Sequence, residues 1–587
     1  MDPIVQERIN EWLSPEYDEL TRREIQTLLD RNDEKELTDR FYTELEFGTA
    51  GLRGTLGAGS NRMNIYVVRK ATQGLANIII HKNAQNRGVL VGRDSRIKSD
   101  EFAKEAVGVL IANGIKVFYF DDIHPTPTVS FGVRELNAIA GVMITASHNP
   151  KEYNGYKVVW EDGGQIVPPV DKEIISEVRK IKSLSQVKHI PFDKAKESNL
   201  FKIVDREIDS VYLNKVKSLS IHPEVISKSE IKICYSPLYG TGYKLIPESL
   251  KNYGFKNIEI VKEQATPDGN FPGVPYPNPE VPEAMESGIK IAQSINADLF
   301  IATDPDADRM GTALRKDDGS FILLNGNQIA AVLGYYILSE LRNTKRMPKN
   351  PRLIKSIVTT EVLRKITEYY NVALDEVLTG FKWIGAKMNE YEKAGINFVF
   401  GCEESHGYLA GTFVRDKDAV IASSLLAEAA AFYKTKGISL YQILENIYKT
   451  FGYYKESQQS ITMKGKDGLK DMKDIMEKLR NSPPERIENY ETIEVIDLYN
   501  QKAFDVKNKK TLPARGLPVS DVVILKLSSN AKIVARPSGT EPKIKFYFTT
   551  CGDTKNTSET LQDVINIVEK EHRRLKDAFL EKLNLSK

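Results

Sequence analysis

The side chains best suited to chemistry occur in three polar loops, each of which directly follows a short apolar run. The runs AIAGVMI, ADLFIA and INFVF lead into TASHNP at 145–150, TDPDADR at 303–309 and GCEESHGY at 401–408. An apolar run that opens abruptly into polar residues is typical of a buried parallel strand and the loop at its carboxyl end. Ligands bind at that edge of α/β sheets, so the three loops are candidates for one site.

The second loop carries three alternating carboxylates, Asp304, Asp306 and Asp308. Carboxylates on one loop can converge on a hard divalent cation, and Mg²⁺ is the ion we expect. An EF-hand calcium loop is excluded, because Arg309 and Arg315 stand where that loop requires Gly and Glu. An arginine directly beside three acids indicates that a further anion, such as phosphate, also binds there. The alternative is an acidic surface loop.

Ser147 lies among small residues in the first loop, directly before His148. A hydroxyl held after a buried strand can act as a nucleophile, although the GxSxG elbow of lipases is absent. Ten residues later, Lys157 can bring a cation back to the same place. The alternatives are a turn serine and a surface lysine, because Ser, His, Asn and Pro all favour turns.

Two further loops have the composition of anion-binding loops. GTAGLRG combines a glycine-rich backbone with the guanidinium of Arg53, and its spacing matches neither a Walker loop nor the dinucleotide-binding fingerprint. RPSGTEP offers a guanidinium, two hydroxyls and a flexible backbone that suit a phosphate, in Arg536, Ser538, Gly539 and Thr540. A plain hydrophilic turn between strands has a similar composition.

The third polar loop can contact a ligand with several hydroxyl groups. Glu403 and Ser405 are two residues apart, so both can form hydrogen bonds with vicinal hydroxyls. A helix N-terminus with acidic caps is the alternative. The nearby stretches TGFKW, with Thr379, and RDKD, with Lys417, are uninformative when each is taken alone.

The elements that must position these loops follow an α/β pattern. Amphipathic helical stretches such as EFAKEAVGVLIANG alternate with apolar runs, which predicts a parallel sheet covered by helices. After about residue 455 the pattern changes to alternating strands and one long helix. We therefore expect three similar α/β units plus a smaller α+β C-terminal domain around a central cleft. The expected boundaries are a helical extension at 1–45, α/β domains at 46–205, 206–325 and 326–455, and the fourth domain at 456–587.

Three other stretches give structural predictions only. Six prolines within 267–282 predict a stiff connector inside the second α/β unit. Six basic residues and no acid within 342–355 predict a solvated loop rather than a nucleic-acid patch, because no aromatic residues are interleaved. In the last helix, His572 falls on the apolar stripe and is predicted to be a packing residue.

The composition excludes several classes of protein. Of the 587 residues, 41% are apolar and 28% charged, which is typical of a folded chain with several domains. Since 82 Lys and Arg face 80 Asp and Glu, no global basic field is available for nucleic acid or an anionic membrane. Neither a membrane-spanning run nor a secretory signal is present, so we expect a cytoplasmic protein. Three distant cysteines predict reduced thiols.

Taken in order, GTAGLRG, TASHNP with NGYK, DPDADR, TGFKW, CEESHG and RPSGTEP resemble the motifs of the α-D-phosphohexomutase superfamily. The resemblance is closest to the phosphoglucomutase and phosphopentomutase branch and spans roughly residues 45–550. It implies that Ser147 is a phosphoserine nucleophile, and that the three aspartates and a phosphoserine oxygen hold Mg²⁺. It also implies four domains around a cleft, in agreement with the expected fold.

The resemblance implies roles for the remaining motif residues as well. Arg53 and Arg309 would flank the transferring phosphoryl group, and His148 and Lys157 would serve proton transfer and orientation. Contacts with the sugar and the rest of the substrate would come from Thr379, Glu403, Ser405 and Lys417. The non-reacting phosphate would be held by Arg536, Ser538, Gly539 and Thr540. Some phosphomannomutases carry His where this chain has Phe381, which argues against a preference for mannose.

The expected reaction is the interconversion of glucose 1-phosphate and glucose 6-phosphate, with glucose 1,6-bisphosphate as activator and intermediate. The expected partners are small sugar phosphates, with neither nucleic acid nor membrane. A mutase for ribose or deoxyribose phosphates and a sugar-bisphosphate synthase remain open, because these sugars present similar hydroxyls. Two alternatives belong to different classes: a metal-dependent phosphatase with Asp304 as nucleophile, and a non-catalytic sugar-phosphate sensor.

Overall fold

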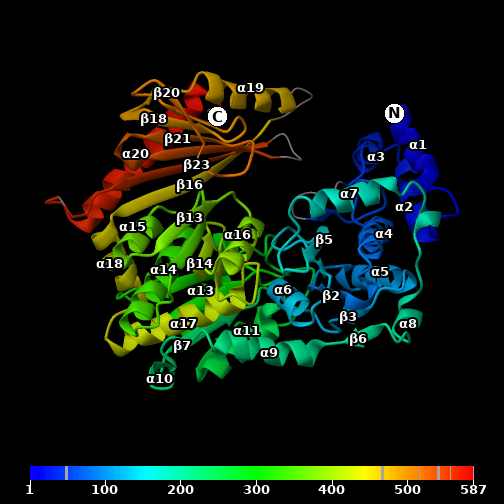
Figure 1. Ribbon diagram of the computed structural model, residues 1–587, viewed down its shortest axis with the longest axis horizontal. Coiled ribbons are helices and arrows are strands. Elements are labelled where there is room, and N and C mark those ends of the chain that lie inside the picture. Colours follow the sequence, from blue (N-terminus) through cyan, green and yellow to red (C-terminus); the bar gives the residue numbers. More distant parts are fainter. Residues whose placement is uncertain (46–50, 464–467, 515, 539–542, 556, 586–587) are drawn as a thin grey trace. The chain divides into compact units, whose positions relative to one another are not determined.

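The chain forms two compact units, which are described separately (Figure 1). The first comprises Met1–Gly326 and Phe381–Ser439, and the second comprises Asn327–Gly380 and Leu440–Lys587. This computed structural model describes all residues except 46–50, 464–467, 515, 539–542, 556 and 586–587. The third expected α/β segment contributes to both units.

The first unit opens with three helices, α1 (Pro3–Trp12), α2 (Glu19–Asp30) and α3 (Glu34–Phe41). An aspartate precedes each helix and accepts a backbone N–H of its first turn, which satisfies a donor that the helix itself leaves unpaired. Their apolar faces pack together, and the Trp12 ring stacks on Tyr17 with ring centroids 4.5 Å apart.

A sheet of six strands follows, in the spatial order β1-β5-β4-β2-β3-β6. Its strands are β1 (Leu52–Thr55), β2 (Val89–Arg93), β3 (Val117–Tyr119), β4 (Ala140–Ile144), β5 (Tyr153–Trp160) and β6 (Phe201–Ile203). The strands β4, β2, β3 and β6 are parallel, and β5 runs antiparallel to both of its neighbours, β4 and β1. The accompanying helices are α4 (Ile65–His81), α5 (Ser99–Ala112), α6 (Thr126–Glu135), α7 (Val170–Lys180) and α8 (Phe192–Ala195). Because helices pack on the sheet, β2, β3 and β4 are almost wholly buried and read as continuous apolar runs.

The second sheet has the order β11-β10-β9-β7-β8 and repeats this plan. Its strands are β7 (Lys232–Ser236), β8 (Asn257–Ile260), β9 (Leu299–Thr303), β10 (Met310–Arg315) and β11 (Phe321–Leu323). Its helices are α9 (Asp205–Lys217), α10 (Pro223–Ile226), α11 (Gly242–Tyr253), α12 (Lys262–Ala265) and α13 (Pro282–Ser294). Residues 266–281, the proline-rich connector, lie between α12 and α13 and contain neither helix nor strand.

The first unit is completed by α16 (Phe381–Ala394), the hairpin of β14 (Asn397–Glu403) and β15 (Gly407–Ala410), and α17 (Ala419–Thr435). In all three α/β segments a buried strand therefore enters a polar loop and returns antiparallel: β4 to β5, β9 to β10, and β14 to β15. A tight return of this kind brings residues before and after the loop side by side.

The second unit combines a parallel pair of strands with a larger antiparallel sheet. The pair is β12 (Pro351–Ser356) and β13 (Ala373–Val377), accompanied by α14 (Gly326–Asn343), α15 (Val362–Tyr370) and α18 (Leu440–Phe451). The antiparallel sheet has the order β16-β23-β22-β21-β18-β19-β20, with β17 paired to β18. Its elements are β16 (Tyr453–Thr462), α19 (Gly468–Asn481), β17 (Arg486–Ile487), β18 (Tyr490–Asp497), β19 (Lys502–Asp505), β20 (Lys510–Pro513), β21 (Val523–Leu527), β22 (Lys532–Pro537), β23 (Lys543–Gly552) and α20 (Leu561–Lys582).

Several smaller predictions can be compared with the structure. His572 is buried in α20 and contacts the hydroxyls of Ser457 at 2.6 Å and Thr550 at 3.0 Å, so the predicted packing role is confirmed. The three cysteines are free thiols. The prediction of a solvated loop over 342–355 is wrong at its end, because β12 begins at Pro351 and buries Lys355 completely. Within the described residues, no helix is both long and apolar enough to cross a membrane.

Candidate active site

The loop after β4 holds Ser147 in a strained and buried position. Its φ of 52° lies in the left-handed region, which non-glycine residues adopt only when their surroundings require it. Its backbone N–H donates to the Thr145 hydroxyl at 2.8 Å. Its Oγ donates to Asp304 Oδ2 at 2.7 Å and lies 3.1 Å from His148 Nδ1. The first and second polar loops therefore meet at one hydroxyl group.

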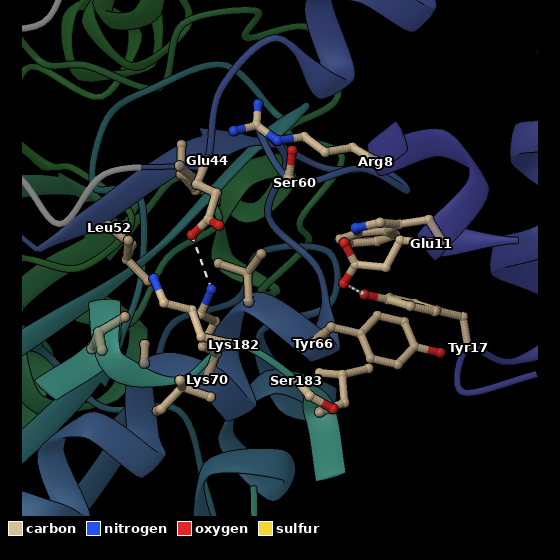
Figure 2. A pocket seen from close by; sticks show the side chains of 17 residues that line it. Arg8, Glu11, Tyr17, Glu44, Leu52, Ser60, Tyr66, Lys70, Lys182 and Ser183 are labelled. Atoms are coloured by element: carbon tan, nitrogen blue, oxygen red, sulfur yellow. Dashed lines mark hydrogen bonds and ion pairs between the residues drawn. The ribbon is translucent and has the colours of Figure 1, made fainter. Parts of the chain in front are cut away.

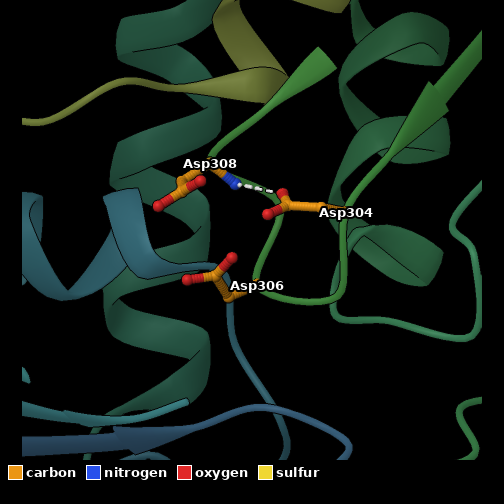
Figure 3. A group of neighbouring side chains, drawn as sticks. All are labelled: Asp304, Asp306 and Asp308. Atoms are coloured by element: carbon orange, nitrogen blue, oxygen red, sulfur yellow. Dashed lines mark hydrogen bonds between the residues drawn. The ribbon is translucent and has the colours of Figure 1, made fainter. Parts of the chain in front are cut away.

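The loop between β9 and β10 brings its three carboxylates together (Figure 3). One oxygen from each of Asp304, Asp306 and Asp308 lies within 4.8 Å of the others, and all three residues are buried. Asp304 Oδ1 accepts the backbone N–H groups of Asp308 at 3.1 Å and Arg309 at 2.9 Å, which fixes the loop. Oδ1 of Asp306 and Oδ1 of Asp308 accept no hydrogen bond from any described residue. Buried carboxylate oxygens that accept no hydrogen bond are suited to binding a hard divalent cation.

Two buried lysines face the same carboxylates. Lys157 on β5 pairs with Met143 on β4. Because of this register, Lys157 lies near the end of β4, beside the loop that carries Ser147. Its Nζ lies 2.7 Å from Asp306 Oδ2 and 3.2 Å from Asp308 Oδ2, and Lys417 Nζ lies 2.7 Å from Asp308 Oδ2. The ion pairs of both lysines are therefore made with Oδ2 atoms, and Oδ1 of Asp306 and Oδ1 of Asp308 remain without a hydrogen bond from the described residues.

The electrostatics of the site follow from burial and from these pairings. Burial, followed by the charges of Asp306 and Asp308, raises the pKa of Asp304 well above its usual range. Burial opposes ionisation of Asp306 too, but Lys157 and Lys417 hold the pKa of that carboxyl below its ordinary value. Burial would lower the pKa of Lys157, yet Asp306 and Asp308 keep it raised, so the ammonium stays charged. Burial and the nearby guanidiniums lower the pKa of His148 well below its usual value, which leaves a neutral imidazole beside Ser147.

Two arginines lie at the edges of these loops. Arg53, on β1, donates to the Asn149 side chain at 3.2 Å and so lies at the Ser147 loop. Arg309 follows the aspartates and donates to Glu280 at 2.7 Å, with its Nε 4.0 Å from Asp308 Oδ1. Burial opposes its charge, but Glu280 and the aspartates raise the pKa of Arg309. Burial lowers the pKa of Arg53, although Asp306 opposes this shift. Because an arginine stays protonated in proteins, both guanidiniums are cations next to the carboxylates or the hydroxyl.

The third hairpin is joined to the second by backbone contacts. Met310 N–H donates to the His406 carbonyl at 3.1 Å, and Ala419 N–H donates to the Ala307 carbonyl at 3.3 Å. Glu403 is buried at the end of β14, and Ser405 is half-buried in the turn that follows. The predicted alternative of a helix N-terminus is wrong here, because CEESHG forms the turn of a β-hairpin.

The other predicted site residues lie in the second unit. Thr379 precedes the boundary at Gly380, and its hydroxyl is buried. Arg536 is on β22 opposite Lys545 of β23, and Ser538 N–H donates to the Lys543 carbonyl at 2.7 Å. Gly539 and Thr540 lie outside the described residues. Their joint action with the first-unit residues stays a prediction.

The structure adds a site residue that the sequence reasoning missed. Thr126, at the start of α6, donates its hydroxyl to Asp306 Oδ2 at 2.8 Å, and its N–H donates to the Asp306 carbonyl at 2.8 Å. Thr126, which belongs to the first α/β segment, thereby fixes the position of Asp306. The available signal was the stretch HPTPT, which is separated by three residues from the strand-like run VFYF.

A cavity of about 130 Å³ lies elsewhere, between the N-terminal helices and the first α/β segment (Figure 2). Trp12, Tyr17 and Tyr66 line it together with charged side chains. The charged groups engage one another: Lys70 lies 2.9 Å from Glu44, and the Tyr17 hydroxyl donates to Glu11 at 3.3 Å. None of the predicted site residues lines it, so the chemistry belongs to the loops and not to this cavity.

Comparisons with known proteins agree with this geometry. The models of phosphoglucomutase/phosphomannomutase α/β/α domains I, II and III match residues 44–185, 210–319 and 325–451. The chain is 37% identical over 528 residues to a phosphoglucomutase of Staphylococcus haemolyticus, which covers 90% of this chain and 94% of that protein. It is 35% identical over 566 residues to a phosphoglucomutase of Staphylococcus epidermidis, covering 95% and 99%.

Solved structures share the fold. Parafusin, a phosphoglucomutase of Paramecium in its open form, superposes with a TM-score of 0.68 at 18% identity, covering 92% of this chain and 96% of that one. A phosphoglucomutase/phosphomannomutase family protein of Burkholderia thailandensis gives 0.62 at 17% identity, covering 90% and 96%. The predicted class of three α/β units with a smaller C-terminal domain is confirmed. With its loops, its aspartate trio and these matches, the chain belongs to the phosphoglucomutase/phosphomannomutase family, within the α-D-phosphohexomutase superfamily.

Proposed function

We propose that this protein is a phosphoglucomutase that interconverts glucose 1-phosphate and glucose 6-phosphate through a phosphoserine at Ser147 and glucose 1,6-bisphosphate. The observation that carries the proposal is the 2.7 Å contact between Ser147 Oγ and Asp304, because it joins a buried hydroxyl to an oxygen-rich cation site. The curated relatives named phosphoglucomutase, with about 35% identity over most of the chain, support the same reaction.

In the first transfer, the free hydroxyl of the sugar monophosphate attacks the phosphorus of phosphoserine, and the bond from phosphorus to Ser147 Oγ breaks. The hydroxyl proton leaves to a nearby base as glucose 1,6-bisphosphate forms. In the second transfer Ser147 Oγ loses its proton and attacks the other phosphate; the bond from that phosphorus to the sugar oxygen breaks, and the sugar oxygen gains a proton to become the free hydroxyl of the product. Neutral His148, with Nδ1 3.1 Å from Ser147 Oγ, is placed to accept and return the proton of this oxygen.

The donor set suits Mg²⁺, with Asp304, Asp306, Asp308 and a phosphoserine oxygen as the proposed ligands. The bound ion supplies positive charge for the phosphoryl oxygens and orients the group. Arg53 and Arg309 would add two guanidiniums around the same group. Lys157 and Lys417 keep their charge and orient the aspartates; with its pKa raised, Lys157 is an orienting group rather than a base.

The remaining contacts are proposed from the motifs. Sugar hydroxyls would be bound by Glu403, Ser405 and Thr379, and the non-reacting phosphate by Arg536, Ser538, Gly539 and Thr540. Such a clamp holds either end of the sugar while the bisphosphate turns over, and it excludes water that would hydrolyse phosphoserine. We also propose that the four domains of the chain span residues 46–205, 206–325, 326–455 and 456–587.

Peptide mass analysis of the purified protein tests the proposal. We expect phosphate on Ser147 after incubation with glucose 1,6-bisphosphate and Mg²⁺, and turnover of glucose 1-phosphate. The ratio of kcat/KM for glucose 1-phosphate to that for ribose 1-phosphate measures the sugar preference. Absence of phosphate from Ser147 in active protein would refute the mechanism, and a strong pentose preference would refute the substrate.

A further inference from the structure

Arg96, which the reaction scheme does not use, is a fully buried guanidinium behind the Ser147 loop. It follows β2 in the stretch RDSRIK, and its side chain has no exposed surface. Its Nη2 donates to the carbonyls of Ser147 at 2.6 Å and of Asn149. Its Nη1 donates to the carbonyls of Pro150 at 2.8 Å and Tyr153 at 3.1 Å. One side chain therefore binds four carbonyl oxygens of a seven-residue stretch, 147–153.

These contacts are made to a stretch of backbone that contains a residue in a strained conformation. Ser147 has a left-handed φ of 52°, a conformation that is strained for a residue other than glycine and persists only when its surroundings fix it. The planar fork of a guanidinium can bind several carbonyls at once, whereas a lysine ammonium is a point charge with three donors. Arg96 is thus suited to holding the orientation of Ser147, although it lies on the side of the backbone carbonyl and not of the hydroxyl.

Arg96 is in turn held from two sides. Asp94 accepts the Arg96 backbone N–H at 2.9 Å and the Ser99 hydroxyl at 2.7 Å, and its Oδ2 lies 3.4 Å from Arg96 Nε. From the second α/β segment, the ring of Phe271 lies against the guanidinium, with the carbon 5.0 Å from the ring centroid. Gly269 pairs with Arg96 in an isolated bridge, and a Cβ at Gly269 would lie 2.5 Å from the Ile97 nitrogen.

Phe271 and Gly269 belong to the proline-rich connector of the second α/β segment. A connector without helix or strand but with a buried aromatic ring, 2% exposed, can act as a stiff brace. We propose that Arg96 is the positioning residue of the nucleophile loop, and that the connector, through Phe271, clamps Arg96 and so couples the second α/β segment to the orientation of Ser147. The inference deepens the proposed function, on which its kinetic readout rests.

The test compares Arg96→Lys with a matched control, Arg93→Lys, in the full chain with Mg²⁺ and glucose 1,6-bisphosphate. Arg93 also donates to carbonyls, those of Phe120 at 2.8 Å and Asp121 at 2.6 Å, but these belong to another loop. We expect Arg96→Lys to lower kcat by roughly 10²-fold, since misplacement of a reacting group by about 1 Å costs that much. KM for glucose 1-phosphate is expected to change by less than about threefold, because the substrate contacts stay. Arg93→Lys is expected to change both constants by less than about threefold.

Hydrogen exchange of unphosphorylated protein gives a readout that does not depend on the reaction. Amides of 145–153 are expected to exchange faster in Arg96→Lys and in Phe271→Leu, while those of 120–124 stay unchanged. Phe271→Leu is expected to lower kcat less than Arg96→Lys does. The double variant is expected to have nearly the same kcat as Arg96→Lys alone, because both substitutions act through the guanidinium of Arg96. A change in KM alone, equal effects of the two lysine variants, or unchanged exchange in 145–153 would overturn the inference. Absence of phosphate on wild-type Ser147 would refute the proposed function instead, and leave the exchange result standing.

Discussion

Among the residues that the structure describes, each unit contains a cluster of lysines and carboxylates held out of water, and the two clusters differ in their suitability for catalysis. The cluster that we propose to be catalytic, called the catalytic cluster below, consists of Lys157, Lys417, Asp304, Asp306 and Asp308. The structural cluster consists of Lys355, Lys532, Glu361 and Glu376, together with Arg364, Glu456 and the residues that they contact. The side chains of the catalytic cluster are at most 10% exposed, whereas in the structural cluster Lys355 is fully buried and Glu361 and Glu376 are 21% and 33% exposed. Both clusters therefore hold charges wholly or partly out of water, and burial by itself does not indicate catalysis.

The difference lies in how the remaining acceptors are grouped. In the structural cluster, Glu456 Oε1 is also a buried oxygen without a hydrogen bond from the described residues, but it does not belong to a group of converging carboxylates. In the structural cluster, Lys355 Nζ lies 3.0 Å from Glu361 and 2.9 Å from Glu376, and Lys532 Nζ lies 2.8 Å from Glu361. Arg364 engages the other Glu361 oxygen at 2.9 Å. In the catalytic cluster, Oδ1 of Asp306 and of Asp308 accept no hydrogen bond from the described residues, and a serine hydroxyl lies at the edge. Oxygens left for a cation beside a nucleophile, rather than buried charge itself, indicate catalysis.

Removal of the nucleophile is the strongest test of this comparison. We expect Ser147→Ala to lower kcat for glucose 1-phosphate by at least about 10⁴-fold, because the covalent step is lost. The matched control is Ser356→Ala, a buried serine beside Lys355 whose hydroxyl lies 2.9 Å from that of Thr359. It is expected to keep kcat within about threefold. Phosphate release that survives in Ser147→Ala would instead favour a phosphatase with Asp304 as nucleophile.

Removal of one cation ligand comes next. Asp306→Asn keeps the shape of the side chain but removes a charge that the cation needs, so we expect kcat to fall by about 10³-fold, or about 4 kcal/mol. Calorimetric titration with Mg²⁺ is expected to show weaker binding. Glu376→Gln, in the structural cluster, serves as control and is expected to leave Mg²⁺ affinity unchanged. Unaltered Mg²⁺ binding by Asp306→Asn would contradict the ligand assignment.

The structural cluster is expected to respond in stability rather than in activity. Glu361→Gln leaves Lys355 and Lys532 short of a counter-charge, and loss of a buried partner costs about 3–5 kcal/mol. Urea unfolding measures this change, and kcat of the folded enzyme serves as the comparison. Glu368→Gln breaks an exposed pair with Lys365 on the same helix and is expected to cost less than about 1 kcal/mol. If the two variants lose equal stability, the structural cluster does not stabilise the fold through Glu361.

The smallest expected effect concerns pH. Burial raises the pKa of Glu456 to about 7. Between the ordinary value of 4.5 and about 7, the native state keeps a proton that the unfolded chain has lost. The free energy of unfolding therefore falls as pH rises through this window and is lower above it. Glu456→Gln lacks this penalty, so we expect it to be more stable than the natural protein by about 3 kcal/mol at pH 8 and equal to it at pH 4. A stability difference that does not change with pH would contradict a raised pKa at Glu456.

The sequence predicted the parts that depend on local patterns. Apolar runs followed by polar loops located β4, β9 and β14, and the alternating aspartates identified the group of converging carboxylates that could hold a cation. Thr126 and Arg96 were missed, because their roles rest on contacts with residues about 180 and 51 positions away. Lys355 was placed in a solvated loop because a run of basic residues says nothing about its distant acidic partners, Glu361 directly before α15 and Glu376 on β13.

The order and types of the motif residues, and hence the family and the class of reaction, were determined by the sequence alone, since alternation and spacing act over a few residues. Tertiary structure decided which buried charges form ion pairs and which carboxylate oxygens remain available to bind a cation. It decided too that the carbonyl of Ser147 is held by Arg96. These outcomes depend on strand register and on packing between distant segments, which local sequence does not encode.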